Sequence, residues 1–131
     1  MKEMVYSCER KTPEVIARDS FKGYEFCVIN YGTHPCAYVA IAEGQPYYWA
    51  KSYEDVDVDC HGGFTFMNWG YAGVFSSDYC VIGWDYAHCG DYTGSLIITG
   101  DKKWTTKEIV QECEEVIDQL YVLEHEELLY V

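Results

Sequence analysis

The feature that most constrains the fold of this chain is an amphipathic helical pattern near its C-terminal end. Thr105 and Glu108 have the spacing of a capping box, in which each side chain bonds to the backbone of the other. Apolar residues then recur at helical intervals: Ile109, Val110, Cys113, Val116, Ile117, Leu120 and Tyr121. The residues between them are mostly acidic. The pattern therefore predicts a helix over residues 105–122, with an apolar face that another layer must cover.

Strand-like segments fill most of the chain before this helix and predict that the covering layer is a sheet. Residues 24–31 and 36–41 are rich in aromatic and β-branched side chains, and the turn-forming residues 32–35 separate them, so they predict a hairpin. Further strands are predicted at 63–67, 79–85 and 95–99, with a loop at 69–77. The predicted fold class is α+β: a single domain, mainly an antiparallel sheet, with one long C-terminal amphipathic helix packed on it.

The two ends of the chain are patterned less clearly. The first twenty residues show weak periodicity, although Thr12 as an N-cap and Pro13 at the first helical position predict a short helix that ends before Gly23. Residues 123–131 either prolong the C-terminal helix or add an edge element to the sheet. A length of 131 residues suits one domain over residues 1–131 and is too short for two large ones.

Composition excludes several classes of protein. Hydrophobic residues make up 49% of the chain and aromatic residues 17%, which is too much for a disordered acidic tail. No run approaches the roughly 18 apolar residues of a membrane helix, and the charged N-terminus differs from a signal peptide, so we expect a cytoplasmic protein with no membrane partner. The seven cysteines contain no C-x-x-C pair, and their odd number favours free thiols over disulfides or a zinc ribbon.

The charge of the chain limits its partners. Nine basic residues against 22 acidic ones give a formal net charge of −13, which opposes direct binding to nucleic acid. The same charge would suit a protein that occupies a basic groove in place of nucleic acid, although acidic residues also serve solubility alone. The stripe of Asp55, Asp57 and Asp59 is predicted to be solvated, because a calcium loop would need Gly where Cys60 stands and Glu where Phe66 stands.

Two segments contain residues that a plain sheet-and-helix domain does not require, and the first is His61-Gly62-Gly63. Paired glycines permit positive φ and a close approach of backbone N–H groups to a ligand, so His61 would stand beside a small anion-accepting nest. The plainer interpretation is a tight turn that contains a histidine.

The second segment runs from Asp85 to Asp91 and follows an apolar strand. Asp85, His88 and Asp91 are three residues apart, so a tight loop or one helical turn would bring a base and two carboxylates to one side. The plainer interpretation is that Asp85 caps the following turn and that Asp91 belongs to ordinary turn chemistry. If the two segments converge, the predicted catalytic residues are His61, His88, Asp85 and Asp91. A divalent metal would accept these ligands, but their spacing matches no standard metal motif, so the cofactor is left unknown.

Aromatic residues supply candidate walls for a pocket around these groups. Aromatic rings stack on nucleotide bases, and a glycine pair can donate N–H groups to a phosphate. Tyr47 and Tyr48 would otherwise cover the edge of the sheet. The predicted ligand-binding residues are Gly62, Gly63, Tyr47, Tyr48, Trp69 and Trp84.

A further hypothesis for the same segments is that they form the site of a Cys–His hydrolase. Cys60 neighbours His61 and Cys89 neighbours His88, but adjacent residues on an extended chain face opposite ways. A working pair would therefore need Cys60 with His88, or Cys89 with His61, across the fold.

Four stretches of the chain share a pattern with other sequences. They are Cys36-Ala37-Tyr38-Val39, Pro46-Tyr47, His61-Gly62-Gly63-Phe64-Thr65 and Ile82-Gly83-Trp84-Asp85-Tyr86-Ala87-His88-Cys89-Gly90-Asp91. In these stretches the chain resembles a group of uncharacterised small proteins of tailed phages and prophages. The two His-containing motifs are the specific ones, so the resemblance raises the weight on His61, Asp85, His88 and Asp91.

The resemblance implies a phage accessory protein that acts in the host bacterial cell, in a role such as counter-defence. We expect it to bind a small nucleotide-derived ligand in a His, Asp and aromatic pocket, and to sequester it or hydrolyse a phosphodiester or N-glycosidic bond. The alternative is an acidic inhibitor, similar to an anti-CRISPR decoy, that docks on a basic nucleic-acid-binding groove of a host defence effector. Its acidic surface would comprise residues 54–59 with Glu108, Glu112, Glu114, Glu115 and Asp118. Nothing in the sequence decides between a monomer and a homo-oligomer.

Overall fold

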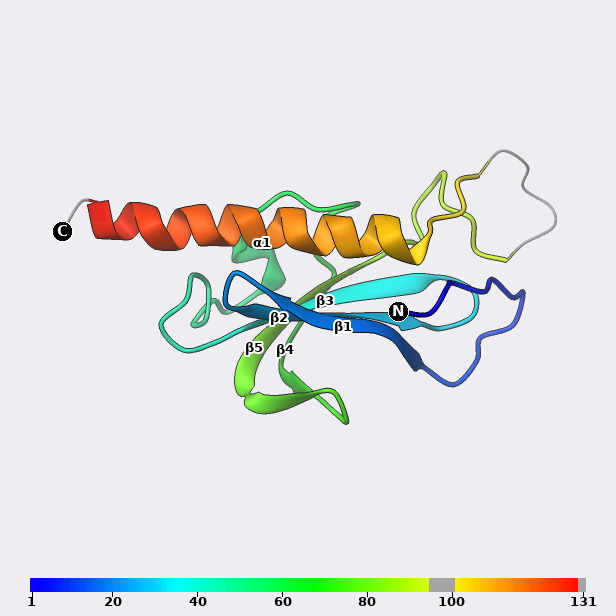
Figure 1. Cartoon of the computed structure of the whole chain (residues 1–131), viewed down its shortest axis with the longest axis horizontal. Coiled ribbons are helices and arrows are strands. Elements are labelled where there is room, and N and C mark those ends of the chain that lie inside the picture. The colour runs from blue at the N-terminus through cyan, green and yellow to red at the C-terminus, as the bar shows by residue number, and fades with distance from the viewer. Residues whose placement is uncertain (95–100, 130–131) are drawn as a thin grey trace.

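One long helix lies across a five-stranded sheet in the computed structural model, which describes residues 1–94 and 101–129 (Figure 1). The strands are β1 (Glu14–Phe21), β2 (Tyr24–Asn30), β3 (Pro35–Ile41), β4 (Phe66–Tyr71) and β5 (Phe75–Asp85). Their order in the sheet is β1-β2-β3-β5-β4, and every neighbouring pair is antiparallel. A short 3₁₀ helix, η1 (Tyr53–Asp55), lies between β3 and β4, and α1 (Thr106–Leu129) follows β5. The predicted α+β fold class is confirmed.

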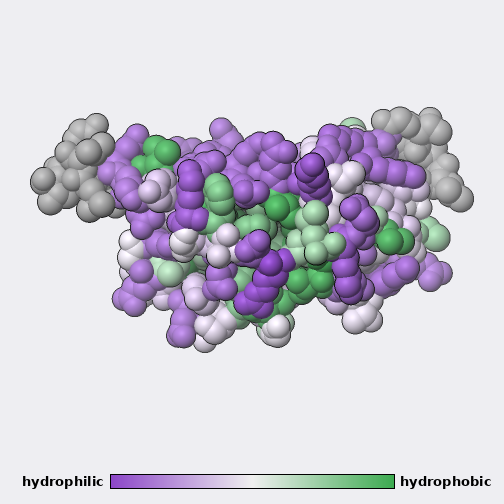
Figure 2. All heavy atoms as spheres, viewed as in Figure 1, coloured by the Kyte–Doolittle hydropathy of each residue, from purple (hydrophilic) through white to green (hydrophobic). Residues whose placement is uncertain are grey.

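The apolar face of α1 packs against the sheet, as its periodicity predicts. Its fully buried residues are Ile109, Cys113, Val116, Ile117 and Leu120. The capping box forms as well, because the Glu108 N–H donates to Thr105 Oγ1 (3.2 Å) and the Thr105 N–H donates to Glu108 Oε1 (3.0 Å). Figure 2 shows hydrophilic residues along α1 at the top of the view and hydrophobic residues gathered below it. Within the described residues, no helix has the length and apolar character that crossing a membrane requires.

The opposite face of the sheet carries a second, smaller hydrophobic cluster. Its centre is Tyr31, whose hydroxyl lies 2.9 Å from that of Tyr38 and 2.6 Å from that of Tyr71. Gly83 leaves room for the Tyr38 ring, since a Cβ there would lie 2.6 Å from it. Burial on both faces explains why β2 and β3 are almost entirely apolar instead of alternating.

The prediction of an N-terminal helix is wrong, because residues 14–21 form β1. Lys22 and Gly23 adopt positive φ of 49° and 86° and make the two-residue turn of a hairpin, with Phe21 opposite Tyr24. Pro13 therefore precedes a strand. The local pattern misled because pairing with β2, a long-range interaction, overrides a weak helix-start signal.

Four other expectations also need correction or completion. The strand predicted at 63–67 begins at Phe66, since Gly62 and Gly63 hold positive φ in the turn before it. The loop predicted at 69–77 is instead the tip of the β4–β5 hairpin, in which Tyr71 pairs with Phe75. Residues 123–129 prolong α1, and the strand predicted at 95–99 lies outside the described residues.

The acidic segment after η1 runs beside α1. Val56 and Val58 are buried while Asp55, Asp57 and Asp59 are exposed, so the predicted solvated stripe is confirmed without any strand pairing. Two hydrogen bonds fix the segment to the helix. The Asp59 N–H donates to Gln119 Oε1 (2.9 Å), and Gln119 Nε2 donates to the Asp59 carbonyl (2.8 Å).

Ile117→Asp is expected to lower the free energy of unfolding by several kcal/mol, because it places an unpaired carboxylate among side chains that exclude water. Val122→Asp is the matched control: Val122 lies further along α1 and is 53% exposed, so the change should cost less than about 1 kcal/mol. Chemical denaturation followed by circular dichroism measures both. Equal midpoints for Ile117→Asp and the parent would show that α1 packs through another face.

Candidate functional site

The two His-containing segments converge beside the N-terminal half of α1. His61 Nε2 lies 2.7 and 3.0 Å from the two carboxylate oxygens of Asp91. The rings of His61 and His88 are 5.7 Å apart between centroids, and His88 Nε2 lies 3.3 Å from Asp85 Oδ1. The structure therefore brings together all four residues that the sequence singled out as catalytic.

Asp91 is the centre of this group. It is only 5% exposed, and besides His61 it accepts hydrogen bonds from Trp104 Nε1 (2.9 Å) and from the His88 N–H (3.0 Å). Burial alone would raise the pKa of Asp91, but the donors from His61, Trp104 and His88 together hold it below the ordinary value of 3.8. Asp91 is thus an anion at neutral pH. Since a carboxylate only accepts, the proton between it and His61 belongs to Nε2 of the imidazole.

Aromatic rings hold the His61 imidazole in place. The ring of Tyr86 stacks on it with centroids 4.8 Å apart and planes 8° apart, and Trp104 meets it edge-on at 4.9 Å. Tyr86 is fully buried, and its hydroxyl oxygen accepts a hydrogen bond from Trp84 Nε1 (3.1 Å). His61 therefore has a fixed ring plane and a fixed tautomer, which is the arrangement that acid–base chemistry uses.

The glycine turn does not offer the anion-binding nest that its sequence suggests. Gly62 and Gly63 do have positive φ, 71° and 82°. However, the Gly63 N–H donates to the Cys60 carbonyl (3.1 Å), and the His61 N–H donates to Glu112 Oε1 (2.6 Å). Two donors of the turn are thus already used, one of them by a carboxylate that would repel a phosphate.

Gly62 serves a different purpose, which is close approach of the two segments. A Cβ at this position would collide with the His88 ring, whereas one on Gly63 would meet nothing within 4 Å. Only glycine lets the His88 imidazole lie against the turn.

His88 is the more exposed of the two histidines, with 35% of its side chain accessible against 24% for His61. Its Nε2 is buried against Gly62, and among the described residues it has no hydrogen-bond partner, because the approach of Asp85 at 3.3 Å lacks hydrogen-bond geometry. His88 is also one of the residues that border a hollow of about 280 Å³. That hollow is lined by Ala87, His88, Cys89, Gly90, Asp91, Thr93 and Asp101. A buried imidazole nitrogen without a partner is rare in packed structures and is found at functional positions.

The aromatic residues predicted as walls lie elsewhere. Trp69 pairs with Cys80 on β5. Cys80 is five residues from Asp85 along that strand, so the two residues lie roughly 16 Å apart, given a rise of about 3.3 Å per strand residue. Tyr48 contacts Trp69 there, with ring centroids 5.0 Å apart. Trp84 lies in the core, where it is 1% exposed. Tyr47, which precedes Tyr48, packs against the main core. The prediction that Tyr47, Tyr48, Trp69 and Trp84 line the pocket of the histidines is therefore wrong, because none of them borders the hollow at His88.

Sequence reasoning missed three residues of the site, Tyr86, Trp104 and Glu112. Trp104 directly precedes the capping box, a position where an apolar residue commonly packs back on the first turns of a helix, so a weak signal existed. Glu112 lies among the acidic residues that predict a solvated helix face. Only the tertiary structure shows that its carboxylate accepts the N–H of His61.

The cysteines give no support to a Cys–His hydrolase that uses Cys60. Burial, reinforced by the nearby Glu112 carboxylate, raises the pKa of the Cys60 thiol to about 12, so it is not a thiolate at neutral pH. All seven cysteines are free thiols, as predicted. The part of the chain that the structure describes contains no group of three or more His, Cys, Asp or Glu side chains arranged to hold a metal ion.

No protein-family model, curated protein or solved structure matches this chain. The chemistry of the site must therefore be derived from its own side chains. These are an oriented His61–Asp91 pair, a second imidazole at a hollow, and carboxylates on several sides.

Gly62→Ala is expected to destabilise the protein by more than Gly63→Ala and to displace the His88 ring. Both changes force a residue with a side chain into positive φ, at a cost of about 1 kcal/mol, but only the first adds a collision with His88. Denaturation curves and the chemical shifts of His88 measure the two effects. Equal losses of stability with unchanged His88 shifts would contradict the close approach.

The contribution of Asp91 to stability is expected to disappear in acid. Its folded pKa lies below the unfolded value of 3.8, so its stabilising effect is complete above that pH and is lost as the pH falls through the folded pKa. Unfolding free energies of the parent and Asp91→Asn, measured between about pH 6 and 2, should therefore differ most at the upper end of the range and converge below about pH 4. A difference that grows toward low pH would show that the sign is reversed.

Proposed function

We propose that the cluster of His61, Asp91 and His88 is an acid–base site for a small nucleoside-type ligand, and that it suits hydrolysis of an N-glycosidic bond. The observation that carries the proposal is the His61–Asp91 pair, in which a buried carboxylate fixes one imidazole next to a second one at a hollow. A hollow of about 280 Å³ is close to the size of pockets that hold small ligands.

The two imidazoles differ in their surroundings and so take different roles. His88 borders the hollow, and because its Nε2 is buried against Gly62, its Nδ1 donates the proton to the leaving nitrogen as the bond between that nitrogen and the sugar carbon breaks. His61 is bonded to Asp91 through Nε2, which leaves Nδ1 to accept a proton from the attacking water. The water oxygen bonds to the sugar carbon, and the nucleobase departs with the electrons of the broken bond. Asp91 is a positioning residue, because it acts through His61.

Charge favours the N-glycosidic bond over the phosphodiester. Cleavage next to a sugar carbon develops positive charge on the ring, which the surrounding carboxylates of Asp85, Asp91 and Asp101 stabilise. A phosphodiester would bring negative charge to the same place. Lys102, whose backbone forms a bridge with Asp91, is paired with Glu108 (2.8 Å) and lies over the Trp104 ring.

Lys22 and Lys51 do not compensate for this negative charge. Lys22 pairs with Asp118 at 2.6 Å on another part of α1, and Lys51 lines a hollow beside Trp69 at the far end of the sheet. A ligand that carries phosphates would therefore have to place them away from the carboxylates and present only its nucleoside end to His88.

The resemblance to phage proteins suggests a biological use for such a site. Removal of a nucleotide-derived signal, by cleavage or by sequestration, would be a counter-defence activity in an infected bacterium. Cleavage and sequestration would both use the same hollow. They are distinguished by whether the ligand is recovered cleaved or intact.

The test is a panel of nucleosides, ADP-ribose derivatives and cyclic dinucleotides, measured by calorimetry and thermal shift. A binder is then incubated with the protein and recovered after denaturation. We expect products cleaved at the N-glycosidic bond. Intact ligand would instead indicate sequestration, and no binding across the panel would refute the proposal.

Turnover is expected to fall by at least about a hundredfold in His88→Ala, because the leaving group loses its proton donor. His125→Ala is the matched control, since His125 is exposed on α1 and bonds to Tyr121. His61→Gln retains a donor for Asp91, so it should fold like the parent and still lose turnover. Full activity in both site variants would exclude the assigned roles.

A further inference from the structure

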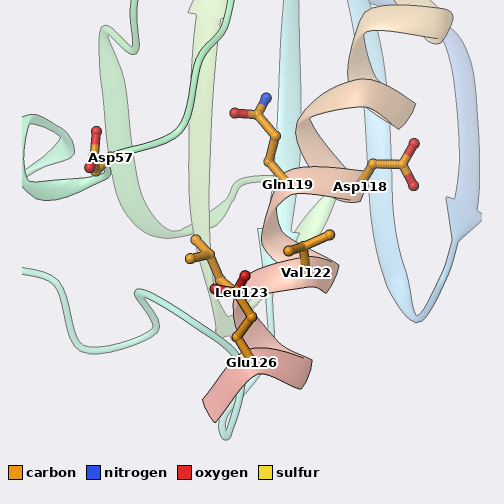
Figure 3. A pocket seen from close by; sticks show the side chains of 6 residues that line it. All are labelled: Asp57, Asp118, Gln119, Val122, Leu123 and Glu126. Atoms are coloured by element: carbon orange, nitrogen blue, oxygen red, sulfur yellow. The ribbon is translucent and has the colours of Figure 1, made fainter. Parts of the chain in front are cut away.

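A groove at the C-terminal half of α1 lies apart from the histidine site. It encloses about 400 Å³, and its lining comes from the helix and from the acidic segment beside it (Figure 3). The residues that line it are Asp57, Asp118, Gln119, Val122, Leu123 and Glu126. Figure 3 shows Asp57 on the segment opposite the helix, with Gln119 and Leu123 projecting toward that side and Asp118 projecting away from it.

The groove combines an apolar floor with an acidic rim. Val122 is 53% exposed, and Leu123 next to it is half-buried against the core. Carboxylates flank them, from Asp57 on the segment and from Asp118 and Glu126 on the helix. Apolar surface bordered by charge of one sign is typical of a site that recognises a partner.

The rim keeps a net negative charge even though one of its carboxylates forms an ion pair with a lysine. Lys22 Nζ lies 2.6 Å from Asp118 and over the Tyr121 ring, so this lysine neutralises one carboxylate. Asp57 and Glu126 have no ion-pair partner among the described residues, and Asp59 is exposed beside them. The two hydrogen bonds between Gln119 and Asp59 fix the spacing of the two rims.

We infer that this groove is a docking site for a basic amphipathic segment of another protein. Such a segment would insert an apolar side chain over Val122 and Leu123 and place Lys or Arg side chains beside Asp57 and Glu126. A second copy of this chain is a poor occupant, because each copy carries a net charge of −13. Nucleic acid is excluded by the same repulsion. A basic protein segment satisfies both the floor and the rim.

The probe for this proposal is a labelled synthetic peptide of Lys, Leu and Ala that forms an amphipathic helix, with binding followed by fluorescence anisotropy. Two sister peptides replace every Lys with Glu or every Leu with Gln. We expect only the first peptide to bind, and its affinity to fall as salt rises from about 50 to 300 mM, because screening weakens the rim contacts. Absence of binding, or equal binding of the Leu→Gln peptide, would overturn the proposal.

Matched variants separate the groove from general attraction to an acidic protein. Asp57→Asn with Glu126→Gln should weaken binding by about tenfold, whereas Glu3→Gln with Glu9→Gln changes the net charge equally at exposed positions of the N-terminal segment and should leave it unchanged. Val122→Ser should weaken it about fivefold, and Val5→Ser, at a residue 59% exposed, should not. Equal effects in the two members of either pair would overturn the assignment to this groove.

His88→Ala tests whether the peptide binds at the groove or at the histidine site. It should leave peptide binding unchanged, so loss of hydrolysis and loss of docking are separable outcomes. If His88→Ala weakens the peptide as much as the groove variants do, the peptide binds at the histidines and the groove assignment fails.

Discussion

Burial of the apolar face of α1 against the sheet is the interaction on which the rest of the structure depends. Once that face is fixed, the polar residues along its edges lie at set positions and hold other segments. Glu112 and Gln119 are seven residues apart, which places them on one face of the helix, and they bond to His61 and Asp59 respectively. Further along, Glu124 accepts a hydrogen bond from the Tyr24 hydroxyl (2.9 Å). The helix thus organises the irregular segments as well as the core.

Asp91 plays the corresponding part among the loops. A buried carboxylate is costly unless it is fully bonded, and here an imidazole, an indole and a backbone N–H share that task. Because those donors come from three separate segments, satisfying one charge fixes the positions of all three. The same bonds give His61 its tautomer, so the features that stabilise the loops also prepare the chemistry of the site.

Negative charge has different consequences at the two ends of α1. Near its start, carboxylates surround imidazoles and would stabilise a developing cation. Toward its end, they border an exposed apolar floor at Val122 and would attract a basic partner. The net charge of −13 does not distinguish these settings, since what a carboxylate does depends on the groups within a few ångströms of it.

The sequence by itself determined those features that arise from neighbours along the chain. Helical periodicity and a capping box specify α1, and alternation of turn and apolar residues specifies the β2–β3 hairpin, because local spacing decides which side chains share a face. The Asp-x-x-His-x-x-Asp spacing likewise marked three residues that do lie together. Only the tertiary structure decided that residues 14–21 form a strand, that Tyr48 and Trp69 lie far from the histidines, and that Trp104 and Glu112 belong to the site. Those outcomes depend on contacts between residues distant in sequence, whose energies exceed local preferences and leave no periodic pattern in the chain.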